Sequence, residues 1–490
     1  MFQKVLIANR GEIACRIQRT LRDLGIAGVA VYHHEDRDAP HVLAADEAVV
    51  LENDVPTAAY LDHAAIIEAA RRTGAQAIHP GYGFLSENAA FAEAVERSGL
   101  VFIGPDSRVI RLMGDKIRAR EFAAAHGIPV APSAMLERSL QDFLERASGI
   151  GFPLLVKAAA GGGGKGMRIV RTGTELEPSV RAAAGEAQRY FADGRVFIER
   201  YIEQPRHIEV QVLGDGRGGV VHLFERDCSV QRRYQKIIEE SPAPAIPAEL
   251  RDAITGAATR LASAARYRNA GTVEFILAPD GTFYFLEMNT RLQVEHPVTE
   301  LVLDVDLVAE QLRIAAGAPL SLRQDDLQPA GHAIECRICA EQPARNFLPA
   351  TGRIALLRLP AGDGIRFDSG IRAGQTVTPA FDSMLAKLIA HGRTRHEARI
   401  RLVSALRQLI VLGVPTNIEY LMRVLENAEF AAGRVHTGLL TQEAARLRQH
   451  PPTSEDTAAV ILAAALSQPD FRQHSFGMPE PYASIGSWHN

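Results

Sequence analysis

Residues 152–171 read FPLLVKAAAGGGGKGMRIVR and are the most informative segment of the chain. Two apolar stretches flank a run of glycines, a pattern that predicts two β-strands joined by a Gly-rich loop. Without side chains, the backbone N–H groups of such a loop can approach anionic oxygens closely. Lys157 on the entering strand and Lys165 in the loop can direct ammonium groups at the same anion. We interpret the segment as a nucleotide-phosphate loop, with a flexible hairpin that binds no ligand as the alternative.

Lysine usage supports this interpretation. The chain has 54 lysines and arginines, of which only six are lysines: Lys4, Lys116, Lys157, Lys165, Lys236 and Lys387. Because arginine supplies positive charge nearly everywhere, a retained lysine indicates a need for its compact ammonium group, as in phosphate binding. We assign such a role to the four that lie beside Gly-rich or carboxylate-rich stretches, and we interpret Lys4 and Lys387 as chance occurrences.

Composition excludes several protein classes. With 490 residues, 47% of them hydrophobic, the chain can form several cores and is not expected to be disordered. A net charge of −4 argues against a nucleic-acid-binding surface, and no apolar run approaches the ~20 residues of a membrane span. The four scattered cysteines indicate a reducing compartment. Because no signal-peptide pattern precedes the first strand and arginine is so strongly preferred, we expect a cytoplasmic, bacterial protein.

The alternation of apolar and amphipathic segments predicts the domain organisation. In residues 1–114, five short apolar runs alternate with helical patterns, including one from Ser86, the expected N-cap, to Arg97. This alternation is typical of an α/β domain with a parallel sheet. We expect a second domain at 115–330, with the Gly-rich loop in a lid at about 131–203. A third domain should cover 331–446, and residues 447–490 read as a tail or linker.

Two glutamates define a second candidate site. Glu274 and Glu287 lie on apolar segments joined around Asp280-Gly281, a strong hairpin signal. If the turn centres there, residue i pairs with residue 561 − i, and the two carboxylates face each other across the ladder. Their repulsion at ~4 Å would be on the order of 4 kcal/mol at an effective dielectric of ~20. A divalent cation between them would reverse its sign, and Asn289 would add a neutral oxygen. The alternative is a pair of solvated carboxylates.

A third group of residues could hold a small anion beside the nucleotide. Arg291 is followed by Gln293, Val294 and Glu295, and the upstream run QRRYQKIIEE (231–240) contributes Lys236. Lys236 and Arg291 could clamp the anion, and Glu295 could act as a base. Alternating charges are more often a solvated surface, so this signal alone is weak.

Several ordered motifs resemble one known family. They include KVLIANRGEIACRI (4–17), HPGYGFLSEN (79–88), KAAAGGGGKGMRIV (157–170), RHIEVQVLGD (206–215), RDCSVQRRYQK (226–236), EMNTRLQVEHPVTE (287–300) and ECRICAE (335–341). Together they resemble biotin carboxylase, the ATP-grasp component of biotin-dependent carboxylases that act on acetyl-CoA, propionyl-CoA or methylcrotonyl-CoA. The likeness covers roughly residues 1–445. It implies an α/β protein with an ATP-grasp fold, preceded by a Rossmann-like α/β domain and followed by a biotin carboxylase C-terminal domain.

The resemblance also implies residue roles. The expected ATP-binding residues are Lys116, Lys157, Gly161, Gly162, Gly163, Gly164, Lys165, Gly166, Glu199, Arg200, Tyr201, Ile202, His207, Gln231, Tyr234, Glu274 and Glu287. The expected metal ligands, for Mg²⁺ or Mn²⁺, are Glu274, Glu287 and Asn289. Bicarbonate should contact Lys236, Arg291, Gln293, Val294 and Glu295, of which Lys236, Arg291 and Glu295 would be catalytic. Arg337 should lie near biotin.

The implied reaction is the ATP-dependent carboxylation of biotin by bicarbonate through carboxyphosphate. Because the chain lacks an AMKM-like motif, biotin should arrive on a separate carrier protein or domain, with a carboxyltransferase subunit as a further partner. The family likeness also implies a homodimer. Two alternatives remain open. One is another ATP-grasp ligase that forms an acyl phosphate, and the other is a catalytically silent subunit.

Some positions depart from the family pattern. Tyr234 stands where the family usually has His, which is the sole support for a silent subunit. Ala160 replaces a common Gly, Arg200 a common Lys, and Cys339 a common Asn. Cys339 also forms a CxxC pair with Cys336, which we interpret as ordinary thiols because no further ligands occur at zinc-site spacing.

Overall fold

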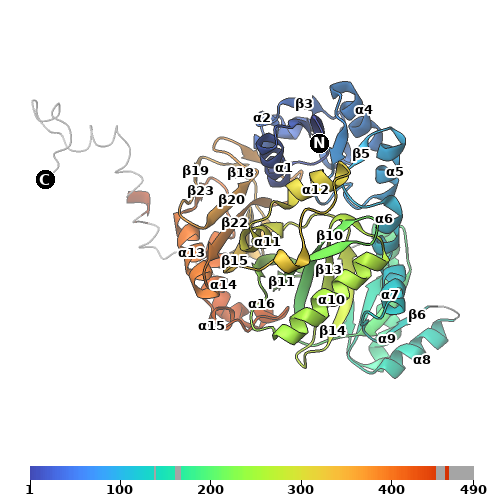
Figure 1. Cartoon of the computed structure of the whole chain (residues 1–490). Helices are drawn as coiled ribbons and strands as arrows, with labels where there is room; N and C mark the ends of the chain where they lie inside the picture. The colour runs from blue at the N-terminus through green and yellow to red at the C-terminus, as the bar shows by residue number, and fades with distance from the viewer. Residues whose placement is uncertain (137–138, 160–166, 449–457, 459, 463–490) are drawn as a thin grey trace, which may run out of the picture.

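The structure is a computed structural model that describes residues 1–136, 139–159, 167–448, 458 and 460–462 (Figure 1). Gly161, Gly162, Gly163, Gly164, Lys165 and Gly166 therefore lie outside the described residues, as does most of the expected tail. Among the described helices, none is long and apolar enough to cross a membrane.

The N-terminal part contains a five-stranded parallel sheet in the order β3-β2-β1-β4-β5, which confirms the expected α/β unit. Its strands are β1 (Lys4–Ile7), β2 (Ala27–Tyr32), β3 (Glu47–Val50), β4 (Ala77–His79) and β5 (Val101–Phe102). The helices are α1 (Gly11–Asp23), α2 (Pro40–Leu43), α3 (Pro56–Ala59), α4 (His63–Thr73), α5 (Ala89–Arg97) and α6 (Ser107–Gly114). Ser86 is not the cap of α5. Asn88 takes that place, because its side chain accepts a hydrogen bond from the Phe91 N–H.

A four-stranded antiparallel sheet, ordered β6-β9-β7-β8, carries the two strands predicted around the Gly-rich segment. Leu154 of β7 (Leu154–Ala158) pairs with Val170 of β8 (Arg168–Val170). Helix α7 (Lys116–Ala125) precedes this sheet and packs against the largest sheet of the molecule. The other strands of the four-stranded sheet are β6 (Ser133–Met135) and β9 (Val196–Arg200), and its helices are α8 (Leu140–Ile150) and α9 (Gly173–Phe191). We call this unit the lid.

The largest sheet has eight strands in the order β14-β13-β10-β11-β12-β15-β22-β20. They are β10 (Arg206–Asp215), β11 (Val220–Arg232), β12 (Gln235–Ser241), β13 (Arg268–Leu277), β14 (Phe283–Asn289), β15 (His332–Cys339), β20 (Ile365–Ser369) and β22 (Met384–Gly392). Because β12 pairs with β15, the sheet continues from the central part of the chain into its C-terminal part.

The remaining elements surround this sheet. Helices α10 (Ala248–Ala264), α11 (His296–Leu303) and α12 (Leu307–Ala315) follow in the central part. The C-terminal part adds α13 (Arg395–Gln408), α14 (Ile418–Glu426), α15 (Ala428–Ala431), α16 (Leu439–Gln442) and α17 (Ala444–Leu447). Its short strands are β16 (Glu341–Gln342), β17 (Leu348–Pro349), β18 (Gly352–Arg353), β19 (Leu356–Arg358), β21 (Thr376–Val377) and β23 (Ile410–Leu412).

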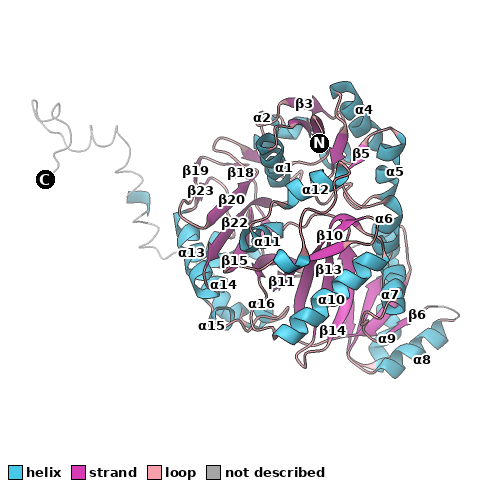
Figure 2. Ribbon diagram, viewed as in Figure 1, coloured by secondary structure: helices cyan, strands magenta, loops and turns pink. Residues whose placement is uncertain are grey.

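Helices α10 and α13 lie beside the eight-stranded sheet (Figure 2), and the two faces of this sheet differ in chemistry. Against α10 and α13 the strands present apolar side chains, such as Ile208, Phe275 and Leu388, which join the two largest buried clusters. The opposite face carries a charged residue from every strand. In strand order these are Glu287, Glu274, Glu209, Arg226, Glu239, Arg337, Lys387 and Asp368. We call this the charged face, and α1 and α11 pack against it.

Two register shifts shape the charged face. The β13–β14 loop comprises Pro279, Asp280 and Gly281, one residue more than the predicted two-residue turn, so the pairs nearest the loop sum to 560. A bulge at Leu286 then restores the predicted pairing of Glu274 with Glu287. In β12, Val230 pairs with Ile238 and Gln231 pairs with Lys236, which leaves Ile237 as an extra residue. That bulge allows both Lys236 and Glu239 to reach the charged face.

Candidate active site

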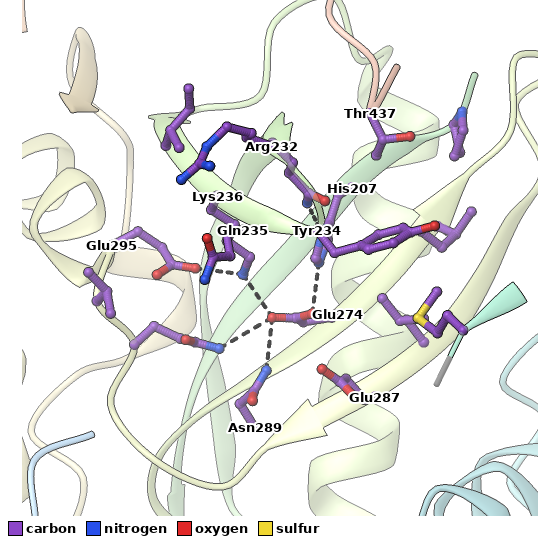
Figure 3. Close-up of a pocket in the computed structure, with 18 of the residues that line it drawn as sticks. His207, Arg232, Tyr234, Gln235, Lys236, Glu274, Glu287, Asn289, Glu295 and Thr437 are labelled. Atoms are coloured by element: carbon purple, nitrogen blue, oxygen red, sulfur yellow. Dashed lines mark hydrogen bonds and ion pairs between the residues drawn. The ribbon is translucent and has the colours of Figure 1, made fainter. Parts of the chain in front are cut away.

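A cavity of about 530 Å³ lies between the lid, the charged face and the C-terminal part of the chain (Figure 3). Every predicted site residue that the structure describes lines it: Lys116, Lys157, Glu199, Arg200, Tyr201, Ile202, His207, Gln231, Tyr234, Lys236, Glu274, Glu287, Asn289, Arg291, Gln293, Val294, Glu295 and Arg337. Residues from three separate parts of the chain therefore meet in one cavity, and their individual roles remain predictions.

The facing carboxylates are each balanced by a cation. Glu274 is buried, and its Oε1 accepts hydrogen bonds from Lys236 Nζ at 2.8 Å and Asn289 Nδ2 at 2.8 Å. Its Oε2 lies 2.8 Å from His207 Nε2, and Glu287 pairs with Lys116 at 2.8 Å. Burial alone would raise the pKa of Glu274, but Lys236 and His207 more than offset it and hold that pKa well below its usual range. The alternative of two solvated carboxylates does not describe Glu274.

The donor set fits a hard divalent cation. Glu274 and Glu287 face each other from neighbouring strands, and both offer carboxylate oxygens. The third predicted ligand, Asn289, donates its amide to Glu274 and accepts from Arg291 NH2 at 3.1 Å through its oxygen. Oxygen ligands of this kind suit Mg²⁺ or Mn²⁺. A metal at this position would replace the repulsion between the carboxylates with attraction.

Lys236 connects the two ends of the cavity. Its Nζ lies 2.5 Å from Glu209 Oε2. The same Nζ lies 2.8 Å from Glu274 Oε1 and 2.6 Å from Glu295 Oε1 (Figure 3). Burial alone would lower the pKa of Lys236, but the three carboxylates raise it well above its usual value. The ammonium group is therefore permanently charged, as an anion clamp requires.

Glu295 is held between two cations. Besides Lys236, Arg337 NH2 donates to its Oε2 at 2.9 Å. Burial would raise the pKa of Glu295, but Lys236, Arg337 and Arg226 hold it well below its usual range. Arg337 also donates to Glu239 at 2.6 Å. Glu295 is thus an ionised, oriented acceptor at the wall of the cavity. Because a general base works best with a pKa near the working pH, proton transfer to Glu295 requires substrate to displace part of this pairing.

Arg291 is oriented by a residue that sequence reasoning missed. Its Nε donates to Glu87 Oε2 at 2.8 Å, and the Thr290 N–H donates to Glu87 Oε1 at 3.0 Å. Its NH1 donates to Gln293 Oε1 at 2.8 Å. Glu87 belongs to HPGYGFLSEN, so the N-terminal part of the chain fixes an arginine that is 204 positions away. Only the motif itself could have drawn attention to Glu87.

One end of the cavity, the predicted nucleotide end, carries Lys116 and Lys157, the two described lysines of the predicted phosphate site. Lys157 forms an ion pair with Glu199, which also accepts from Arg120 NH1 at 3.0 Å. Burial lowers the pKa of Lys157 more than Glu199 raises it. Lys116, beside Glu287, has a raised pKa because that carboxylate offsets the burial of the ammonium group.

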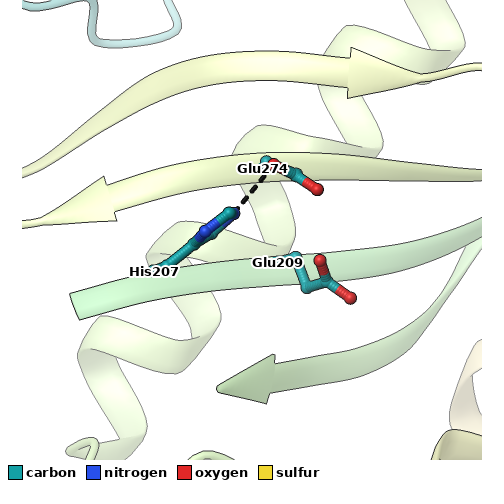
Figure 4. A group of neighbouring side chains, drawn as sticks. All are labelled: His207, Glu209 and Glu274. Atoms are coloured by element: carbon teal, nitrogen blue, oxygen red, sulfur yellow. Dashed lines mark hydrogen bonds and ion pairs between the residues drawn. The ribbon is translucent and has the colours of Figure 1, made fainter. Parts of the chain in front are cut away.

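His207, Glu209 and Glu274 project from neighbouring strands toward one point (Figure 4). On β10, the buried polar residues His207, Glu209 and Gln211 alternate with apolar ones. A central strand that buries polar residues on one side at period two indicates a functional face. This alternation was a signal for Glu209 that the sequence analysis did not use.

The structure changes the interpretation of Lys387. It is not a chance surface lysine, because its side chain is wholly buried on the charged face and its Nζ contacts the Val294 carbonyl oxygen at 2.7 Å. In the sequence, Lys387 lies in a short apolar segment, and that pattern alone does not show whether a lysine side chain is buried or exposed.

Of the departures from the family pattern, Ala160 lies outside the described residues, whereas Tyr234, Arg200 and Cys339 lie within them. Arg233 and Tyr234 form the two-residue turn between β11 and β12, with φ of 50° and 65°, and Tyr234 is half exposed at the cavity. All four cysteines are free. Among the described residues, neither Cys336 nor Cys339 belongs to a group that could hold a metal ion.

Comparison with known proteins identifies the family. Residues 1–110 match the biotin carboxylase N-terminal domain, residues 115–323 the ATP-binding domain of the carbamoyl-phosphate synthase L chain, and residues 335–442 the biotin carboxylase C-terminal domain. The biotin carboxylase of Haemophilus influenzae is 51% identical over 435 residues, which cover 88% of this chain and 97% of that protein. The mitochondrial methylcrotonoyl-CoA carboxylase subunit alpha of Dictyostelium discoideum is 45% identical over 99% of this chain and 70% of that protein.

A solved structure agrees in fold. The biotin carboxylase domain dimer of 2-oxoglutarate carboxylase from Hydrogenobacter thermophilus, in complex with MgADP, ADP and bicarbonate, has a TM-score of 0.89 and 44% identity. The match covers 92% of this chain and all of that one. The ATP-grasp architecture predicted from the motifs is therefore confirmed, and the chain belongs to the biotin carboxylase family.

Proposed function

We propose that this cavity is where ATP and bicarbonate react and biotin is carboxylated, the first half-reaction of a biotin-dependent carboxylase. The overall reaction follows from the family, and the residue roles are our proposal. One observation carries it: a single ammonium group, that of Lys236, contacts both Glu274 at the nucleotide end and Glu295 at the bicarbonate end. The two substrates would thus meet across one charged residue.

In the first step, Glu295 would accept the proton of bicarbonate while a bicarbonate oxygen attacks the γ-phosphorus of ATP. The bond from that phosphorus to the bridging oxygen breaks, giving ADP and carboxyphosphate. Lys236 and Arg291 would neutralise the negative charge of the bicarbonate, and Gln293 and the backbone of Val294 would orient it. Such a reaction depends mainly on positioning and charge neutralisation.

In the second step, carboxyphosphate would divide into CO₂ and phosphate. The phosphate can remove the proton from the ureido nitrogen of biotin, which then forms its bond to the carbon of CO₂. Arg291 would stabilise the enolate-like anion, and Arg337, which contacts Glu295 and lines the same cavity, would contact biotin. Closure of the lid would exclude the water that hydrolyses carboxyphosphate.

The proposed metal ligands are Glu274, Glu287 and Asn289. A bound Mg²⁺ or Mn²⁺ would neutralise the charge of the ATP phosphates. Lys116 and Lys157 would contact the same phosphates, and the adenine would lie by Glu199, Arg200, Tyr201 and Ile202, which line the cavity together with His207, Gln231 and Tyr234.

The partners follow from the chemistry. We propose, as the family likeness implies, that biotin arrives on a carrier protein or domain and that a carboxyltransferase consumes the product. The homologous Hydrogenobacter domain was solved as a dimer, which supports a homodimer here. We further propose a cytoplasmic location.

The decisive experiment measures ATP turnover by the purified chain with and without bicarbonate and free biotin. We expect turnover to require bicarbonate and to rise when biotin is added. If turnover requires bicarbonate but does not change when biotin is added, the result would instead favour another ATP-grasp ligase. No turnover with a folded, ATP-binding protein would favour a silent subunit.

A further inference from the structure

Lys387 occupies a position that the proposed chemistry does not explain. It lies in the middle of β22, opposite Arg337 on β15 and Asp368 on β20, and its side chain is wholly buried. Burying an ammonium group costs several kcal/mol unless well-placed acceptors compensate it. The contacts of this group should therefore show what it does.

The nearest acceptor of Lys387 is a backbone oxygen of the proposed bicarbonate site. Its Nζ donates to the carbonyl of Val294 at 2.7 Å, while its ion pair with Glu12 Oε1 is longer, at 3.3 Å. Val294 stands between Gln293 and Glu295, the side chains proposed to orient and deprotonate bicarbonate. An ammonium group on the Val294 carbonyl fixes the peptide plane that joins Val294 to Glu295.

Glu12 connects this contact to the cavity wall. It belongs to α1, is buried, and accepts a hydrogen bond from the hydroxyl of Tyr82, a residue that lines the cavity. Helix α1 and strand β22 thus meet at Lys387, directly behind residues 293–295. Two other buried carboxyls, Glu335 and Asp368, act on the ammonium group through their charge only. Glu335 has no hydrogen-bond partner among the described residues, and Asp368 accepts hydrogen bonds from Arg366 and Arg19.

We propose that Lys387 is a positioning residue for bicarbonate binding: by holding the Val294 carbonyl, it fixes the loop that presents Gln293 and Glu295 to the anion. This inference deepens the proposed function and rests on it. Lys387 does not reach the nucleotide end of the cavity, so its loss should affect bicarbonate and leave ATP binding nearly unchanged. A purely structural ion pair with Glu12 would affect both substrates or neither.

The test isolates the bond between Lys387 and Val294. Glu12→Gln provides the reference protein, because removing only Lys387 would leave Glu12 as an uncompensated buried charge. Lys387→Met is then added to Glu12→Gln, and the two proteins are compared by thermal unfolding. The KM values for bicarbonate and for ATP are measured in bicarbonate-dependent ATP turnover with free biotin.

We expect the added Lys387→Met to raise the KM for bicarbonate about tenfold, the range of a lost hydrogen bond to a charged group, and to change the KM for ATP less than twofold. Lys387→Gln in the same background, which keeps an N–H donor on a shorter side chain, should raise the bicarbonate KM by a smaller factor. If the methionine variant folds poorly, the glutamine variant still tests the proposal.

A matched control lies on the other face of the sheet. Arg395 donates to both oxygens of the buried Glu240, at 2.6 and 2.9 Å. Arg395→Met with Glu240→Gln should lower thermal stability without changing the KM for bicarbonate. Equal bicarbonate KM values with and without Lys387, or a parallel rise in the KM for ATP, would overturn the proposal. Failure of the proposed function would look different, because the unmutated protein would then show no bicarbonate-dependent turnover.

Discussion

The two faces of the eight-stranded sheet use the same strands for different purposes. On the face covered by α10 and α13, side chains such as Leu388 and Ile334 pack into a large apolar cluster. On the charged face, Arg226 and Glu209 are equally buried but form an ion pair, and the partly exposed Lys236 pairs with the same Glu209. Apolar burial stabilises a fold directly, whereas a buried ion pair roughly balances its desolvation cost.

The difference indicates where stability and chemistry reside. If the charged face contributed mainly to stability, apolar residues of similar volume would serve as well or better. Its network of acids and bases is instead matched to a reaction that handles phosphate and bicarbonate anions. Changes on the apolar face should therefore affect folding, and changes on the charged face should affect turnover.

The largest expected effect on turnover comes from Arg291→Ala. Losing one charged donor from a site that stabilises developing negative charge should lower biotin-dependent turnover by about 10²–10³-fold. The affinity for MgATP, measured by calorimetry, should stay within about tenfold, because Arg291 contacts Glu87, Gln293 and the amide oxygen of Asn289 but none of the lysines or carboxylates of the nucleotide end. Lys236 is a less selective probe, since its ammonium group also holds Glu274. A collapse of nucleotide affinity in Arg291→Ala would contradict its assignment.

On the apolar face, Leu402→Ala should have the largest effect on stability. Leu402 is wholly buried on α13 in the cluster that contains Leu388. The cavity left behind should lower the free energy of unfolding by about 2–5 kcal/mol, measured by urea denaturation. KM values for ATP and bicarbonate should remain within twofold. The exposed Leu412→Ala is the control and should change stability by less than about 0.5 kcal/mol. Changed KM values in the folded Leu402 variant would weaken the contrast between the faces.

Glu287→Gln tests the metal site. It removes one carboxylate of the facing pair and leaves the Lys236 network intact, so the Mg²⁺ concentration for half-maximal turnover should rise about tenfold or more. Glu335→Gln is the matched control, because Glu335 lies on the same face, away from the facing pair. Unchanged Mg²⁺ dependence in Glu287→Gln would exclude Glu287 as a ligand.

The smallest expected effect concerns pH. Burial, partly offset by Arg337, raises the pKa of Glu239 from 4.5 to about 7. The folded protein therefore holds this proton more tightly than the unfolded chain, so the stability contribution is fully present below about pH 4.5 and is lost as the pH rises through 7. Glu239→Gln removes this dependence.

The measurement is the difference in melting temperature between Glu239→Gln and the unmutated chain from pH 5 to pH 8, without ligands. As the pH rises from 5 to 8, the variant should become more stable relative to the unmutated chain, by the equivalent of about 1–3 kcal/mol. Glu121→Gln on the exposed surface of α7 is the control and should show a constant difference. A constant difference for Glu239→Gln as well would show that Glu239 is ionised throughout.

Much of the site could be predicted because the patterns that indicate it each lie within a short stretch of the sequence. The Gly-rich segment and its flanking strands, the hairpin of Glu274 and Glu287, and the run around Arg291 each have a signature within about 20 residues. The facing pair illustrates the limit. The predicted register holds at Glu274 only because a bulge at Leu286 compensates for a longer loop, and no local signal specified that bulge.

What the sequence determined by itself was the set of local elements, the α/β class and the chemical groups at the site, because periodicity, turn residues and motif spacing act over short distances. What only the tertiary structure decided was which distant groups meet: Glu87 with Arg291, Lys236 with Glu209, Glu274 and Glu295, and Lys387 with Val294. Whether a lysine is exposed or buried against a carbonyl depends on strand order and register, which arise from packing across the whole sheet.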